Sequence, residues 1–293
     1  METAVRIARR YREEKSARSS VAGLGQAAGQ AHNRALRDQL ASLRYEHDGL
    51  SRALYEAAQV QRRLCGPRQW RAGSYEFAGE IFPVRHLSGD FITVLELEGD
   101  LVFAIGDIAG KGLMAGMWFT YVVGMIRRHI AALGDPAAAL SAVEHDLLLS
   151  GLEIPLTTLF LARLNLRSGE LTYSNAGHPP ALVIRENQEV QELSAGGPLL
   201  GLISNASFEN GRASLCPGDM LLAYSDGVAE CRNESGTEFG TPGLLNAARK
   251  FSGSDAGAML FTVLAAVENF MGKQYRDDDM ALFVLRRFSA QID

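Results

Sequence analysis

The sequence has few cysteines, no excess of basic residues and no long apolar segment. Its three cysteines, Cys65, Cys216 and Cys231, are odd in number and widely separated, so they predict neither a disulfide framework nor a thiolate zinc site. The formal net charge of −5 gives no reason to expect nucleic-acid binding, which needs a concentrated basic surface. No apolar run reaches the roughly 20 residues that cross a bilayer, and the polar N-terminal residues lack the apolar core of a signal peptide. These absences favour a cytoplasmic protein without a transmembrane segment.

The 293 residues, of which 47% are hydrophobic, suffice for one large domain and an accessory segment. Residues 1–30 are first basic and then rich in glycine, which predicts a flexible arm. A heptad seam follows, with steps of four and three residues through Leu36, Leu40, Leu43, His47, Leu50, Leu54, Ala57, Gln61 and Leu64. We therefore expect a signalling or dimerisation helix in residues 31–66. Two interpretations stay open: an amphipathic helix lying on its own domain, or a homodimeric coiled coil through residues 36–64.

Gly66 and Pro67 end this pattern, and residues 67–293 form the predicted main domain. Strand patterns occur at residues 75–82, 91–97, 101–108, 157–166, 171–177, 181–185, 220–227 and 281–287. Short turn-forming connections, such as Glu98-Gly99-Asp100, indicate mostly antiparallel pairing. Helical patterns occur in separate blocks, at residues 112–133, 136–149, 241–252 and 254–271. The sequence therefore predicts an α+β fold in which helices cover sheet layers.

Four aspartates stand at the end of an apolar strand or just before one: Asp90, Asp107, Asp226 and Asp278. Strand ends can present side chains to a shared cleft, and Mg²⁺ or Mn²⁺ prefers oxygen ligands from several carboxylates. Without a cation, bringing these carboxylates together would cost free energy through charge repulsion and loss of hydration. If the four side chains converge, we therefore expect them to bind metal. Taken singly, each aspartate is more typical of a turn or loop residue than of a metal ligand, because such a side chain often bonds its own backbone.

Five motifs occur in one order: SGDF, GDIAGKG, NAGHPP, PGDMLLAYSDGVAE and DDMALFVL. Together they resemble the bacterial PPM (PP2C-like) phosphatases of the SpoIIE/RsbU type, over a span from about Tyr75 to Phe288. The resemblance implies a sandwich of two antiparallel sheets flanked by helices. It also implies removal of phosphate from serine or threonine of a partner protein, usually a STAS-domain anti-anti-sigma factor in a partner-switching pathway.

The resemblance also implies which residues bind metal. Asp90, Asp107, Asp226 and Asp278 match the family's ligands of a centre holding two Mn²⁺ or Mg²⁺ ions, and the backbone carbonyl of Ile108 matches a further ligand. In such a centre two cations activate a water and neutralise the phosphoryl oxygens, so the four aspartates are also the predicted catalytic residues. Asp279 is an alternative to Asp278 as the ligand. His178 of NAGHPP is interpreted as a turn residue rather than a general acid.

Two positions depart from the family pattern. Thr93 stands where the family often has a second aspartate, and Ala281 replaces a threonine. The prediction is that these changes weaken the orientation of the metal ligands, at a cost of about 10–100-fold in metal affinity or activity. They also motivate an alternative function, a pseudophosphatase that binds a phosphoprotein or an anti-sigma partner as a scaffold.

Overall fold

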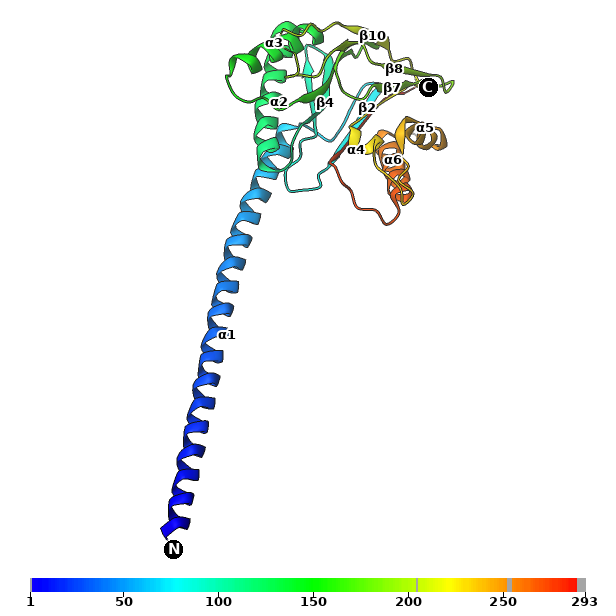
Figure 1. The fold of residues 1–293 in the computed structure, drawn as a ribbon. Coiled ribbons are helices and arrows are strands. Elements are labelled where there is room, and N and C mark those ends of the chain that lie inside the picture. Colours follow the sequence, from blue (N-terminus) through cyan, green and yellow to red (C-terminus); the bar gives the residue numbers. More distant parts are fainter. Residues whose placement is uncertain (1, 204, 252–254, 289–293) are drawn as a thin grey trace. The chain divides into compact units, whose positions relative to one another are not determined.

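The protein divides into two compact units in the computed structural model, which describes residues 2–203, 205–251 and 255–288. These units are Met1–Ala53 and Leu54–Asp293. Helix α1 (Glu2–Leu64) makes up the described part of the first unit and continues with its last turns into the second (Figure 1). The boundary therefore lies inside the helix, upstream of the boundary at residues 66 and 67 that the sequence suggested.

The predicted N-terminal helical extension is confirmed, but α1 is longer than expected. A flexible arm was predicted for residues 1–30, of which residue 1 lies outside the described residues. Residues 2–30 are helical instead, and the helix continues through Gly23, Gly25 and Gly29. Each glycine costs about 1 kcal/mol relative to alanine in a helix. Good helix formers dominate the rest of the segment, and the first proline of the chain is Pro67.

The strands of the second unit form two sheets. The first sheet has the order β1 (Gln69–Ala72), β2 (Tyr75–Phe82), β12 (Met280–Arg287), β11 (Met220–Tyr224), β7 (Ala181–Ile184) and β8 (Val190–Leu193). The second has the order β10 (Gly211–Ser214), β6 (Glu170–Ala176), β5 (Thr157–Asn165), β4 (Asp100–Ile108) and β3 (Phe91–Leu97), with β9 (Gly196–Gly197) beside β6. Every pair is antiparallel except β6 with β9. The predicted mostly antiparallel, two-sheet fold is confirmed.

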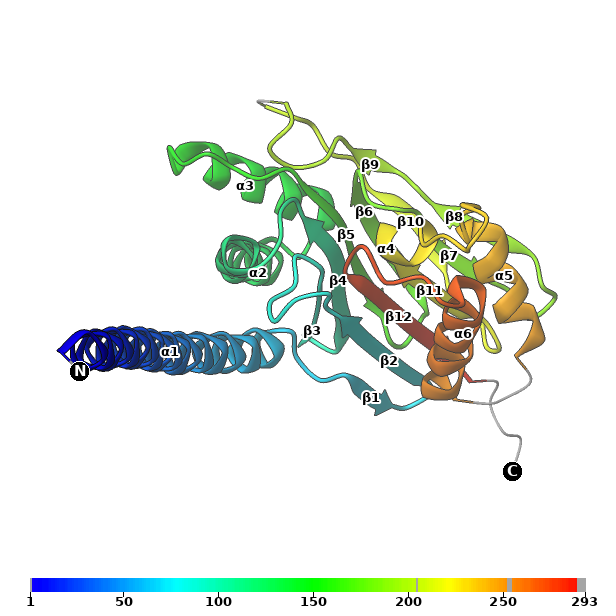
Figure 2. The ribbon, with the colours of Figure 1, turned by 60° about the horizontal axis from the view of Figure 1, so that its bottom comes forward.

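Helices cover the outer faces of both sheets, as Figure 2 shows. Two of them, α2 (Leu113–Leu133) and α3 (Pro136–Leu149), pack against the sheet that contains β3, β4 and β5. The other two, α5 (Gly240–Lys250) and α6 (Ala256–Met271), pack against the sheet that contains β2, β11 and β12. Among the described residues, no helix combines the length and apolarity needed to span a membrane.

The two faces of β4 show how the core is divided. Leu101, Phe103 and Ile105 belong to the core between the two sheets, whereas Val102 and Ala104 lie in the layer beneath α2 and α3. This alternation follows from the two-residue period of a strand, and it allows both faces to be apolar. The predicted strands and long helices agree closely with the observed ones. The elements that the sequence missed are short: β1, β8, β9, β10 and α4 (Asp226–Ala229).

Candidate metal centre

Strand alternation carries two of the predicted ligands to one end of the space between the sheets. In β4, Asp107 is the next residue on the inner face after Ile105, and Ile108 returns to the helix-covered face. On the neighbouring strand β3, Ile92 belongs to the inner core, so Asp90 two residues earlier lies on the same face. The other sheet contributes Asp226, which begins α4 just after β11 ends.

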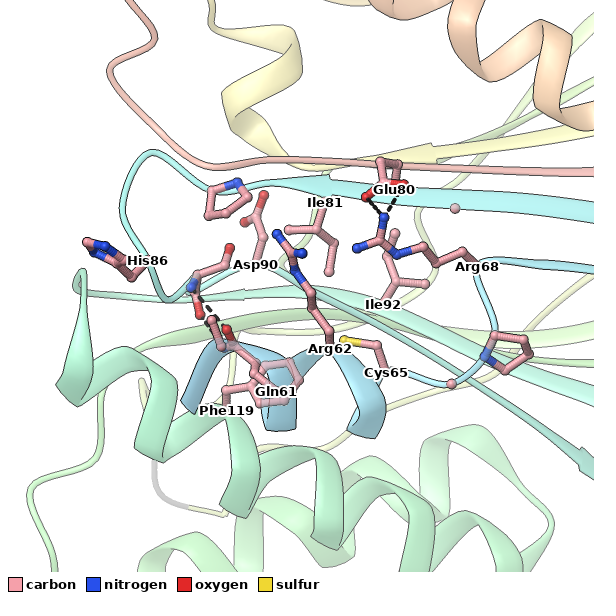
Figure 3. Close-up of a pocket in the computed structure, with 16 residues that line it drawn as sticks. Gln61, Arg62, Cys65, Arg68, Glu80, Ile81, His86, Asp90, Ile92 and Phe119 are labelled. Atoms are coloured by element: carbon pink, nitrogen blue, oxygen red, sulfur yellow. Dashed lines mark hydrogen bonds and ion pairs between the residues drawn. The ribbon is translucent and has the colours of Figure 1, made fainter. Parts of the chain in front are cut away.

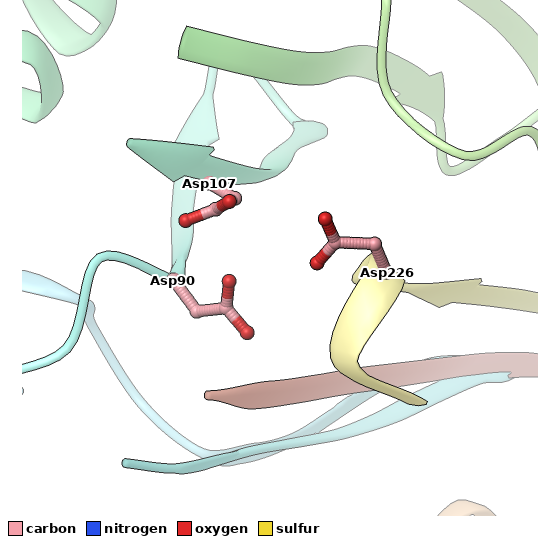
Figure 4. A group of neighbouring side chains, drawn as sticks. All are labelled: Asp90, Asp107 and Asp226. Carbon is pink, nitrogen blue, oxygen red and sulfur yellow. The ribbon is translucent and has the colours of Figure 1, made fainter. Parts of the chain in front are cut away.

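These three aspartates converge. One carboxylate oxygen from each of Asp90, Asp107 and Asp226 lies within 4.8 Å of the others. Figure 4 shows the three side chains pointing toward one another from three separate elements. Asp90 is 1% exposed, so at least one of these carboxylates is almost fully removed from solvent.

Crowding and burial change the acidity of the group. Burial, followed by the charge of Asp107, raises the pKa of Asp90 well above its usual value, although a hydrogen bond from Ser225 opposes the rise. Burial and the charges of Asp226 and Asp278 raise the pKa of Asp107 to about 6. Burial also raises the pKa of Asp226. Each raised pKa means that the protein favours the neutral, protonated form of that carboxyl. A divalent cation bound to the three side chains would favour the charged form instead.

The donor set fits a hard divalent cation, because it offers oxygen atoms and no sulfur or imidazole. A close approach at Gly89 supports the fit. A Cβ atom at this position would lie 2.7 Å from the carbonyl oxygen of Ile108 and 3.0 Å from Oδ1 of Asp107. Only glycine leaves this space open, and the oxygens of Ile108 and Asp107 both border it. The predicted backbone ligand therefore lies next to a predicted carboxylate ligand.

Asp278 lies outside the group of three. Its side chain is 52% exposed, and its Oδ1 atom lies 2.9 Å from the ammonium nitrogen of Lys111. It is near enough for its charge to contribute to the raised pKa of Asp107. The structure therefore places the fourth predicted ligand at the rim of the centre, paired with a lysine.

Asp279 has different surroundings from its neighbour. It is 5% exposed, and its carboxylate accepts hydrogen bonds from the backbone N–H of Val84 (2.7 Å), the hydroxyl of Ser88 (2.9 Å) and the N–H of Gly89 (2.9 Å). These three bonds fix the loop that leads to Asp90. Between the two alternatives for the fourth ligand, Asp279 is engaged with this loop and Asp278 is the more accessible.

Sequence reasoning missed Ser225, although it stands directly before Asp226 in the SDG motif. Its hydroxyl donates a 2.6 Å hydrogen bond to Oδ2 of Asp90 and accepts a 2.8 Å bond from the N–H of Ala281. Ser225 thus links the carboxylate of Asp90, just before β3, to β12 in the opposite sheet. At position 281 the backbone makes this link, so the alanine does not interrupt it.

Thr93 does not face the carboxylates. It lies three residues from Asp90, on the opposite face of β3, and is completely buried. Its hydroxyl accepts a 3.1 Å hydrogen bond from Arg127 of α2, and the same nitrogen of Arg127 lies 3.3 Å from the carbonyl oxygen of Leu64. The idea that Thr93 helps to orient the metal ligands finds no contact in the structure to support it.

Gln61, a position of the predicted heptad seam in the last turns of α1, is buried and contacts its own domain. Its side chain donates a 2.7 Å bond to the carbonyl of Ser88 and accepts a 3.2 Å bond from the N–H of the same residue. A small cavity of about 40 Å³ lies beside it, bordered by Arg62, Cys65 and Asp90 among others (Figure 3). The loop before Asp90 is therefore held by Gln61 on one side and by Asp279 on the other.

His178 is buried rather than placed among the carboxylates. Its Nδ1 atom lies 2.9 Å from the hydroxyl of Thr158, and its backbone exchanges two hydrogen bonds with the side chain of Asn175. Burial lowers the pKa of His178 to about 3. The side chain is therefore neutral at ordinary pH, in agreement with its interpretation as a turn residue.

Comparison with known proteins gives consistent matches. Residues 98–288 match the family described as Stage II sporulation protein E (SpoIIE). The chain is 27% identical over 236 residues to the phosphoserine phosphatase RsbU of Bacillus subtilis, a match covering 79% of this chain and 69% of RsbU. The fold resembles the SiaA-PP2C domain of Pseudomonas aeruginosa, with a TM-score of 0.70, 21% identity and coverage of 83% of this chain and 98% of that domain. It also resembles RsbX in complex with magnesium, with a TM-score of 0.57, 13% identity and coverage of 75% and 98%.

Proposed function

Because this chain belongs to the SpoIIE family of PP2C-like serine/threonine protein phosphatases, we propose that it hydrolyses phosphoserine or phosphothreonine on a partner protein. In this proposal two divalent cations bound at the metal centre of this chain assist the reaction. The observation that carries the proposal is the convergence of Asp90, Asp107 and Asp226 within 4.8 Å. Metal binding explains why three carboxylates from both sheets meet at one point that is buried at Asp90 and half-buried at Asp107 and Asp226. The raised pKa values of all three support the proposal, because burial and mutual repulsion disfavour their charged forms when no cation is bound.

The proposed ligands have distinct tasks. The inner ligands of the cations would be the carboxylates of Asp90, Asp107 and Asp226. The carbonyl of Ile108 would add a backbone oxygen, and the exposed Asp278 would be the outermost ligand. When bound, Mn²⁺ or Mg²⁺ lowers the pKa of a water and neutralises charge on the phosphoryl group.

The surrounding residues keep these ligands in place. Ser225 orients Asp90 through its 2.6 Å hydrogen bond, and Asp279 fixes the loop that precedes it. Helix α2 begins beside the centre without a side-chain cap, so its first N–H groups add positive potential where an anionic substrate would lie.

The proposed substrate is a phosphorylated STAS-domain protein, and the proposed setting is the cytoplasm. Support comes from the likeness to RsbU, whose name describes a phosphoserine phosphatase. We also propose that residues 36–64 form a homodimer. The seam leucines of the first unit are exposed, as expected if a second copy covers them: Leu36, Leu40, Leu43 and Leu50.

The alternative of a pseudophosphatase scaffold loses its motive. Thr93 contacts Arg127 instead of a carboxylate, and the Ala281 backbone is bonded to Ser225. In the part of the chain that the structure describes, these contacts give the scaffold no support of their own. We therefore retain the active phosphatase as the proposed function.

The test is phosphate release from a phosphoserine-carrying STAS-domain protein. We expect release that requires Mn²⁺ or Mg²⁺, stops in chelator, and falls by at least about 100-fold in Asp107→Asn and Asp226→Asn, because each variant removes a charged ligand. Asp48→Asn is the matched control, since Asp48 is an exposed aspartate of α1. Turnover that persists in chelator, or in both ligand variants, would refute the proposal.

A further inference from the structure

Lys111 connects the turn before α2 to the loop before β12. Its ammonium nitrogen lies 2.9 Å from Oδ1 of Asp278 and donates a 2.7 Å hydrogen bond to the carbonyl oxygen of Asp277. The loop before β12 therefore binds the ammonium group of Lys111 through two oxygen atoms, although Lys111 lies far from this loop in the sequence. Oxygen atoms in such an arrangement are also what a hard metal cation prefers.

The pairing can be undone at low cost. The side chains of Lys111 and Asp278 are 38% and 52% exposed, and ion pairs in contact with water are weak. Glycines with positive φ stand on both sides of the lysine, Gly110 at 113° and Gly112 at 79°. These backbone positions suit glycine better than any other residue. Lys111 is thus held in a turn that requires glycine on both sides, and its own side chain reaches the loop before β12 across solvent-accessible space.

We propose that Lys111 is a tethered competitor of the divalent cation for Asp278. In the metal-free protein its ammonium neutralises this carboxylate, and a cation that takes Asp278 as a ligand displaces the ammonium into solvent. Lys111 is a positioning residue, which lowers the affinity of the rim ligand for metal without taking part in the chemistry. This inference rests on the proposed function, because it treats Asp278 as a ligand.

The competition has a definite direction. A cation bound through Oδ1 of Asp278 replaces the lysine at that oxygen, and a cation bound through either oxygen meets a like charge a few ångströms away. Both effects disfavour metal binding, so removing the ammonium should tighten it. Replacing Lys111 with methionine keeps most of the side-chain length and removes only the charge and the hydrogen bonds.

The experiment is calorimetric titration of the full chain with Mn²⁺, which reads binding rather than turnover. Lys111→Met is expected to bind Mn²⁺ about three- to tenfold more tightly than the wild type, whereas Lys111→Arg, which keeps the charge, stays close to it. The matched control is Lys250→Met. Lys250 lies in the last turn of α5, has no ion pair among the described residues and should show the wild-type affinity.

A second pair of proteins tests whether the effect passes through Asp278. In the Asp278→Asn background the gain from Lys111→Met should be clearly smaller, since no ion pair is left to break and only the like-charge repulsion is relieved. The inference is overturned if Lys111→Met binds Mn²⁺ no more tightly than the wild type, or gains equally in both backgrounds. If neither the wild type nor Lys111→Met binds Mn²⁺, the proposed function itself fails, and this inference fails with it.

Discussion

His178 illustrates how burial of a single residue makes stability depend on pH. Its folded-state pKa of about 3 lies below the ordinary value of 6.5. Between these pH values His178 is protonated in the unfolded chain and neutral in the folded chain, so low pH favours unfolding. The stabilisation is complete above about pH 6.5 and is lost progressively as the pH falls toward about 3.

The prediction concerns His178→Gln, which keeps a hydrogen-bonding side chain next to Thr158 and removes the titration. Between pH 7 and 5 the wild type should lose about 2 kcal/mol of unfolding free energy more than this variant. Urea unfolding at several pH values measures the difference, and the carboxylates titrate alike in both proteins. Curves of stability against pH that run parallel would contradict the buried, neutral histidine.

The faces of β3 separate two roles that the sequence had combined. Asp90 lies on the inner face with the metal centre, and Thr93 lies on the outer face beneath α2, where it accepts a hydrogen bond from Arg127. A change at position 93 should therefore affect the contact between strand and helix and leave the metal ligands alone. This differs from the weakened metal centre that the family comparison of motifs suggested.

Thr93→Val tests this division, because valine has nearly the same shape and lacks the hydroxyl. We expect a loss of about 1–3 kcal/mol in unfolding free energy, since a charged donor loses a buried partner. The Mn²⁺ affinity should stay within about twofold of the wild type. Thermal or urea unfolding gives the first quantity and calorimetry the second. A tenfold drop in Mn²⁺ affinity would restore the original hypothesis.

Strand periodicity explains how much of this site could be predicted. Asp107 and Asp90 end or precede strongly apolar strands, and their convergence followed from that placement together with the motif order. The opposite orientation of Thr93 was also encoded, because three residues separate it from Asp90 and a strand alternates every two. The pairing of Lys111 with Asp278 was not encoded in this way. Both residues lie outside regular strands, where no period relates one segment to another.

At the scale of the whole molecule, the boundary of the second unit at Leu54 assigns the last turns of α1 to the unit that contains the metal centre. Ala58 and Gln61 are 6% and 8% exposed, and the two hydrogen bonds of Gln61 hold Ser88, two residues before Asp90. In the first unit the seam leucines Leu36, Leu40, Leu43 and Leu50 are exposed.

Two truncated chains distinguish these parts of α1. A chain that begins at Leu54 should keep the unfolding free energy and Mn²⁺ affinity of the second unit, because it retains Ala58 and Gln61. A chain that begins at Arg68 should lose about 2–4 kcal/mol of unfolding free energy, because the hydrogen bonds to Ser88 and the packing of Ala58 disappear. Its Mn²⁺ affinity should fall as well, since the loop before Asp90 then loses the two hydrogen bonds of Gln61 and keeps those to Asp279 and Ile108.

Urea unfolding and calorimetry of both chains, beside the full chain, give the measurement. Gln61→Leu in the full chain is the companion variant, since leucine keeps the bulk of the side chain and removes both hydrogen bonds. It should reproduce most of the loss in Mn²⁺ affinity seen on truncation to Arg68. If the chain beginning at Arg68 binds Mn²⁺ as tightly as the chain beginning at Leu54, the last turns of α1 have no part in holding the metal ligands.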